Sequence, residues 1–278
     1  MKATPLERIA ILLAALAIAA VLLFPLYWIF LTSVMPTSAL LSRNPPLLPD
    51  PSLVSLDAYR ALFARKPMLT WILNSATVTL ATIALTLAVS AMAGYSLSRY
   101  RTLGQQAAGF ALLVSKMLPP ALIVIPFFIL FSFAGLIETK LGLVLANAAS
   151  AVPFTTWMLK GFFDAIPREL EQAAMIDGCG EMEAAWRIAL PIARPGLAAG
   201  AAYVAIVTWA DLLFARTLMS RPENWLVTVG LQSFMGEYLV DWASLTAAAI
   251  VSVFPVMVLF LLLEPFLVKG MAQGATAN

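Results

Sequence analysis

The chain has 278 residues, of which 62% are apolar and only 12% are charged, and its mean hydropathy is +0.90. Since soluble domains carry about 25% charged residues, this composition predicts an integral membrane protein. The net charge of +2 is spread along the chain, which excludes an electrostatic surface for nucleic acid. Histidine is absent and Cys179 is the only cysteine, which excludes an internal disulfide, a Cys/His metal cluster and a histidine-dependent catalytic pair.

The first apolar run, about residues 9–32, follows Lys2 and Arg8 in the way that a secretory signal follows its basic start. The run is too long for the apolar region of a cleaved signal peptide. We therefore predict a first transmembrane helix that is retained.

Six segments are long and apolar enough to cross a membrane, which takes about 20 residues. They cover about residues 9–32, 71–97, 110–133, 141–163, 196–218 and 242–268. Prolines inside several of them are compatible with membrane helices, because neighbouring helices can satisfy the freed carbonyls. The sequence thus predicts an all-α membrane protein in three parts. These are a first helix with an extracytoplasmic loop (1–70), a core of five helices (71–268) and a tail (269–278).

Six spans place both termini on the same side of the membrane. With the N-terminus in the cytoplasm, nine Lys and Arg residues lie inside and seven outside, which is a weak preference. Arg99 and Arg101, in a short loop without acidic residues, favour the same orientation.

Residues 164–195 interrupt the spans with nine charged side chains. Pro167 suits the start of a helix and Gly178 suits its end, so the pattern predicts a helix over about 168–177. A second helix, over about 181–190, begins with two acidic residues and ends at Pro191. One interpretation is a pair of amphipathic helices that lie on lipid.

The exact residues of this segment favour another interpretation. Glu171-Gln172-Ala173-Ala174-Met175-Ile176-Asp177-Gly178, followed by Trp186-Arg187-Ile188-Ala189-Leu190-Pro191, closely resembles the EAA loop of ABC importer permeases of the carbohydrate-uptake, MalG-like class. The resemblance implies a type I ABC importer permease (MetI-like) fold, in which the cytoplasmic loop 164–195 docks into a cleft of the ATPase subunit. The resemblance also implies which residues couple the permease to the ATPase. They are Leu170, Glu171, Gln172, Ala173, Ala174, Asp177, Gly178, Trp186, Arg187 and Pro191.

The resemblance extends over nearly the whole chain. It includes Asn74-Ser75, the string from Ala93 to Arg99, Pro153-Phe154, Trp209 with Asp211, and Lys269-Gly270. Two departures occur in the loop itself: Gln172 stands where the family usually has the glutamate of the motif, and Cys179 replaces an alanine. In the family that glutamate makes an ion pair with the ATPase, and Gln172 has no charge with which to make it.

The sequence contains no Gly-x-x-x-x-Gly-Lys-Ser/Thr phosphate loop, so the chain does not hold ATP in that manner. The resemblance implies a complex in the bacterial inner membrane. Its other members are a second homologous permease subunit that forms a heterodimer with this chain, two ATPase subunits that bind ATP and Mg, and an extracytoplasmic solute-binding protein. We expect no cofactor in this chain. The expected solute is a sugar or sugar derivative: an oligosaccharide, monosaccharide, polyol or glycerol-phosphate-like anion.

Polar side chains inside membrane spans are costly and usually face a cavity or a partner. Five such residues are candidates for the solute path: Asn74, Lys116, Asn147, Trp209 and Asp211. For Trp209 and Asp211, a hydrogen bond between helices is an equal alternative, and the two asparagines can equally be packing residues. Lys116 lies about six residues into its expected span, which favours a side chain that reaches the interface over one that attracts an anionic sugar.

The loop 219–241 occupies the place where MalG-type subunits contact the binding protein, so Gln232 and Phe234 are candidates for that contact. Trp242 is better explained as an aromatic anchor at the membrane interface. Two rival functions come from other classes. An ion-gradient-driven secondary transporter would need several intramembrane acids or histidines and paired inverted repeats. An intramembrane enzyme would need a convergent catalytic set, which the sequence does not offer.

Overall fold

The computed structural model describes residues 5–100, 102–236 and 240–275, which are almost entirely helical. Within these residues the only β pairing is an isolated bridge between Met235 and Val240. The chain forms two compact units, one of Met1–Leu69 with Leu231–Val253 and one of Thr70–Gly230 with Phe254–Asn278. Each unit is described by itself.

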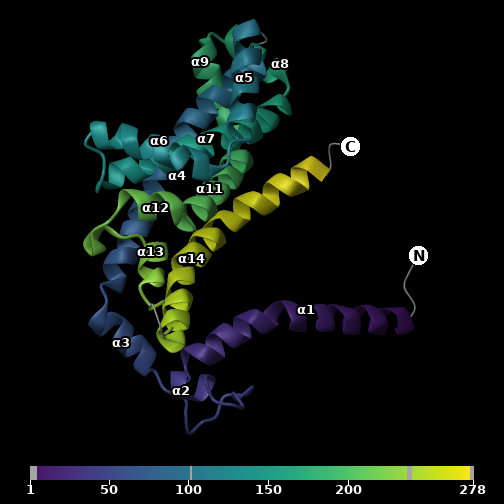
Figure 1. The fold of residues 1–278 in the computed structure, drawn as a ribbon. Coiled ribbons are helices and arrows are strands. Elements are labelled where there is room, and N and C mark those ends of the chain that lie inside the picture. The colour runs from purple at the N-terminus through teal and green to yellow at the C-terminus, as the bar shows by residue number, and fades with distance from the viewer. Residues whose placement is uncertain (1–4, 101, 237–239, 276–278) are drawn as a thin grey trace. The chain divides into compact units, whose positions relative to one another are not determined.

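The first unit contains three helices before its boundary, labelled in Figure 1: α1 (Pro5–Ser33), α2 (Thr37–Leu40) and α3 (Asp57–Arg65). The predicted first span is confirmed as α1, which is apolar from Ile9 to Leu31. The end of α1 forms a small core with α2 and α3, where Leu31, Val34 and Met35 are buried against Tyr59. The loop that follows α1 is therefore partly ordered by short helices.

The second unit holds most of the remaining helices, shown from blue to green in Figure 1. In chain order they are α4 (Met68–Arg99), α5 (Leu103–Ser115), α6 (Pro120–Phe133), α7 (Lys140–Asp164), α8 (Arg168–Ile176), α9 (Glu181–Ala184), the π-helical turn Ala185–Ala189, α10 (Leu190–Ile192), α11 (Arg194–Trp209), α12 (Leu213–Leu218), the 3₁₀ turn Pro222–Asn224 and α13 (Val227–Gln232). Helix α14 (Trp242–Ala275) follows. Helices α4, α13 and α14 each continue across the boundary between the two units.

Four helices, α1, α4, α7 and α14, are long and apolar enough to cross a membrane, and two bent helix pairs bring the total to six. The predicted span over 110–133 corresponds to one of these bent pairs and starts earlier, at Leu103. Helices α5 and α6 meet there at 105°, because the consecutive prolines Pro119 and Pro120 end the first helix and begin the second. The predicted span 196–218 is wrong at its end, since α11 stops at Trp209 and α12 starts at Leu213.

Helix α11 packs closely on α7. Its packed face consists of small residues, including Ala198, Ala201, Ala202 and Ala205, all of which are buried. Small side chains allow two membrane helices to approach closely, so this pair forms the rigid centre of the second unit. The loop between α7 and α11 is thereby held at one end of the bundle.

Candidate functional site

The segment 164–195 forms two helical pieces joined by a tight turn. Helix α8 ends at Ile176, and Gly178 follows with a φ of +97°, a backbone conformation that glycine adopts without strain. The predicted helix 168–177 and its glycine stop are thus confirmed. The second predicted helix, 181–190, runs on to Ile192 and does not end at Pro191, which lies in the short segment Leu190–Ile192 directly after the π-helical turn.

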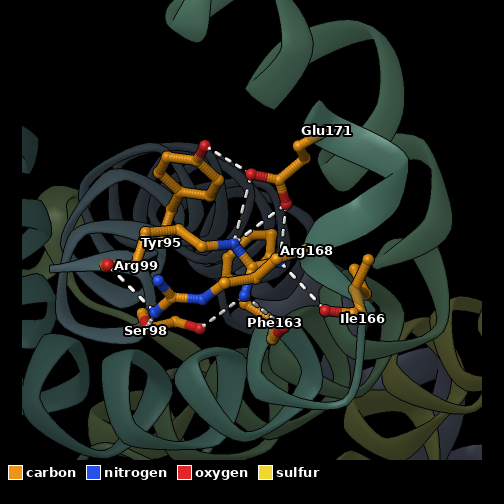
Figure 2. A network of polar contacts seen from close by, with 7 residues as sticks. All are labelled: Tyr95, Ser98, Arg99, Phe163, Ile166, Arg168 and Glu171. Atoms are coloured by element: carbon orange, nitrogen blue, oxygen red, sulfur yellow. Dashed lines mark hydrogen bonds and ion pairs between the residues drawn. The ribbon is translucent and has the colours of Figure 1, made fainter. Parts of the chain in front are cut away.

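Glu171 of α8 points inward and not toward solvent. Its carboxylate forms an ion pair with Arg99 at the end of α4, at 2.5 Å from Nη2 and 2.9 Å from Nε, and accepts a hydrogen bond from the Tyr95 hydroxyl at 2.8 Å. The side chains of Arg99 and Glu171 are 7% and 8% exposed. Figure 2 shows this network at the junction of α4, α7 and α8. Within this chain the geometry makes Glu171 an internal anchor of α8.

Arg99 also fixes the chain between α7 and α8. Its Nη1 donates to the carbonyl oxygen of Phe163 at 2.9 Å, and its Nη2 donates to that of Ile166 at 3.3 Å. In the opposite direction, Arg168 donates to the carbonyl oxygens of Ser98 and Arg99, both at 3.0 Å (Figure 2). A buried guanidinium with its donors satisfied holds a fixed geometry, so the start of α8 is tied to the end of α4.

The opposite face of α8 is open. Leu170, Ala173 and Ile176 are exposed, and Ile176 is 86% exposed. Gln172, Asp177 and Gly178 are exposed as well, and Ala174 is half-buried. A short helix that presents apolar side chains to water on one side and is anchored on the other can bury that face in a groove of a partner.

The second helix of the loop carries the remaining predicted residues. Trp186 is exposed and lines an apolar groove of about 380 Å³ together with Met92, Tyr95 and Met182. Arg187 forms an exposed ion pair with Glu183 at 2.9 Å, one helical turn away, and such a pair contributes little to stability. Pro191 is half-buried.

Three of the predicted solute-path residues are engaged within the chain. The buried Asn74 amide donates to the carbonyl oxygens of Glu223 and Trp225, at 3.0 and 3.1 Å. The Asn147 amide donates to Leu143 of its own helix and to Asp211 at 3.4 Å. The Asp211 carboxylate also caps α12, since it accepts from the backbone N–H groups of Phe214 and Ala215. These contacts are hydrogen bonds between and at the ends of helices.

Lys116 and Trp209 lie where helices end. Lys116 follows the last residue of α5, at the bend before α6, so its expected position about six residues into a span is wrong. Its ammonium is exposed and lies 3.5 Å from the hydroxyl of Tyr203. Trp209 is half-buried at the last position of α11.

The predicted binding-protein contacts lie in the first unit. Gln232 is exposed, whereas Phe234 is buried with the Lys66 ammonium 5.4 Å from its ring centre. This contact leaves Phe234 little surface of its own to offer a partner.

Arg99 and Tyr95 are partners of Glu171 that were not among the predicted site residues. Both occur in the string at the end of the second predicted span, and Glu171 requires a cationic partner once it is buried. Only the fold brings residues 72 positions apart into contact.

Comparisons with known proteins agree with this architecture. The family described as "Binding-protein-dependent transport system inner membrane component" matches residues 86–273. The chain is 33% identical over 223 residues, 80% of both chains, to the maltodextrin transport system permease protein MdxG of Bacillus subtilis. It is 32% identical over 255 residues, 91% of this chain and 92% of the relative, to the trehalose transport system permease protein SugB of Mycobacterium tuberculosis.

A third relative is the sulfoquinovosyl glycerol transport system permease protein SmoH of Agrobacterium fabrum, which is 30% identical over 91% of this chain and 88% of its own length. Among solved structures, a chain of a bacterial ABC transporter involved in the import of the acidic polysaccharide alginate superposes with a TM-score of 0.80. The superposition covers 95% of this chain and 99% of that chain at 22% identity, which is a likeness of fold. The chain therefore belongs to the family of binding-protein-dependent transport system inner membrane components, as a membrane-spanning permease subunit of an ABC transporter and not as an enzyme.

Proposed function

We propose that the chain is one of two permease subunits of an ATP-driven importer that takes up a sugar or sugar derivative delivered by an extracytoplasmic binding protein. The relatives named for maltodextrin and trehalose transport support the solute class. A solved alginate transporter structure that includes a sugar-loaded periplasmic protein supports the binding-protein partner. ATP and Mg belong to two separate ATPase subunits, and both termini of this chain lie in the cytoplasm.

The observation that carries the proposal is the two-sided character of α8. Its inner side is anchored by the buried pair of Glu171 and Arg99, and its outer side presents Leu170 and Ile176. When the ATPases close on ATP, a rigid α8 held in their groove transmits the motion to α4 and thereby switches the access of the solute path.

The test is to purify the chain with its co-encoded partners and to measure ATPase retention and ATP hydrolysis with and without the sugar-loaded binding protein. Ile176→Asp places an unpaired charge in the docking groove, so retention of the ATPase falls at least about tenfold. Leu103→Asp is the matched control, because Leu103 is 85% exposed and an acid suits the first turn of α5.

Two results would contradict the proposal. One is full ATPase retention by the Ile176→Asp variant. The other is solute movement by the chain alone in liposomes under an ion gradient, which would support a secondary transporter.

A further inference from the structure

Lys116 lies between the two helices of a bent apolar pair, α5 and α6, which together are long and apolar enough for one membrane span. Helix α5 has 13 residues, which at about 1.5 Å per residue puts Lys116 about 20 Å from the start of that helix. The chain then bends by 105° into α6, which has 14 residues. Lys116 is therefore central to this helix pair and far from either end of it.

Tyr203 of α11 connects Lys116 to a second aromatic residue, Phe154 of α7. Their ring centres are 4.4 Å apart with an interplanar angle of 42°. The Tyr203 hydroxyl is 3.5 Å from Lys116 Nζ. Three helices separated in sequence thus bring one cation and two rings together.

Nothing in the described part of the chain neutralises this cation. No carboxylate lies within ion-pair distance of Lys116, and its one polar side-chain contact, with Tyr203, leaves other N–H donors available. An exposed ammonium in the middle of an apolar helix pair is costly when it contacts acyl chains, which favours a water-filled path or a ligand at this face.

The exposed rings add the second half of a binding surface. Phe154 is 45% exposed and Tyr203 is half-buried, so ring surface is accessible next to the ammonium. A ring face attracts the C–H groups of a sugar, and the ammonium attracts an anion or hydroxyl oxygens. Asp211 and Asn147, by contrast, are bonded to each other and to the backbone.

We propose that Lys116, Phe154 and Tyr203 form a solute-contact site that receives a sugar carrying an anionic group, such as a carboxylate, sulfonate or phosphate. The sugar ring stacks on Phe154 and Tyr203, and the anion pairs with Lys116. This assignment rests on the proposed function and narrows its substrate class.

The test measures direct binding by calorimetry to the purified complex of this chain with its partner permease and ATPases. The probes are a uronic-acid trisaccharide and the same trisaccharide with its carboxylates reduced to alcohols. The intact complex binds the acidic form about tenfold more tightly, the difference expected for a charge-assisted hydrogen bond. Lys116→Met removes this preference, Lys116→Arg keeps it, and Phe154→Leu weakens both sugars. Lys140→Met is the matched control, because Lys140 is an exposed lysine at the start of α7.

An intact complex that binds both trisaccharides equally would overturn the proposal, as would an unchanged preference in Lys116→Met. After either result, the proposed function as a sugar importer would still hold if the binding protein with any sugar stimulated ATP hydrolysis. A complex that binds neither sugar and retains no ATPase would remove both proposals together.

Discussion

At the scale of single residues, Glu171 is the side chain whose role the fold changes most. An acid that looks like part of a docking motif is buried against Arg99 and Tyr95. Removing one partner of a buried ion pair leaves the other charge uncompensated, which destabilises a protein more than the loss of an exposed pair.

Glu171→Gln is therefore expected to destabilise the chain by about 3 kcal/mol. Glu169→Gln, an exposed position on the same helix, is expected to have almost no effect. Thermal unfolding in detergent measures the difference. We also expect Glu171→Gln to bind the ATPase while its hydrolysis responds less to the loaded binding protein. Equal melting temperatures for the two variants would contradict the anchor role.

Glu138 holds the segment after α12 in place. It accepts hydrogen bonds from the backbone N–H of Ser220 and Arg221 and from the Asn224 amide, at 2.6, 3.1 and 2.9 Å. Partial burial raises the pKa of its carboxyl, but these hydrogen bonds outweigh burial and the pKa lies below the ordinary value of 4.5. Stabilisation by Glu138 is thus present above pH 4.5 and is lost as the pH falls through the folded-state pKa.

Glu138→Gln should lower stability by about 1 kcal/mol at pH 7, because the site is partly exposed to solvent. The difference from the natural chain should shrink as the pH is lowered below 4.5. Melting curves of both proteins over pH 3.5–7 provide the measurement. A difference that stays constant over this range would show that the charge of Glu138 is unimportant.

At the scale of elements, the turn between the two helices of the loop 164–195 depends on Gly178. Its φ of +97° is a conformation that a residue with a Cβ adopts only at a cost. Gly180, two residues later, has an ordinary φ of −73° and open space around it, so it provides the natural comparison.

Gly178→Ala is expected to cost about 1–2 kcal/mol locally and to change the angle between α8 and the helix 181–192. Gly180→Ala should be nearly neutral. Sugar-stimulated ATP hydrolysis by the assembled complex should fall for Gly178→Ala and, more strongly, for Gly178→Asp. If both alanine variants were equally active, the turn geometry would not be required for coupling.

At the scale of the whole molecule, the proposed orientation places the loop 164–195 in the cytoplasm and the loop after α1 outside it. Cys179 is the only cysteine and lies in the loop 164–195, so it reports on that loop directly. Ser42, in the exposed loop between α1 and α3, reports on the other side once a cysteine replaces it.

We expect a membrane-impermeant maleimide to label Cys179 in inside-out vesicles and not in intact spheroplasts. In a Cys179→Ala background, Ser42→Cys should be labelled in spheroplasts. The Cys179→Ala chain without a new cysteine controls for background labelling. Labelling of Cys179 from outside would place the termini on the other side and would exclude coupling through this loop.

Composition and local sequence pattern suffice for the membrane class, the approximate positions of six spans and the two helices of the loop 164–195. Apolar runs and the fixed spacing of Glu171, Gly178 and Pro191 are local features that need no tertiary information. Tertiary structure decided the rest. In the fold, two predicted spans are interrupted, one at Pro119–Pro120 and the other after Trp209. At both places the direction of the chain depends on what the next helix packs against.

Tertiary structure also decided which polar side chains are already satisfied and which are available. Asn74, Asp211 and Lys116 were all solute-path candidates on sequence, since all three are polar groups in apolar surroundings. In the fold the first two are bonded within the chain, and Lys116 is exposed beside Phe154 and Tyr203. The physical reason is that hydrogen bonds and ion pairs join residues that are 60 to 150 positions apart, and sequence spacing carries no information about such pairs.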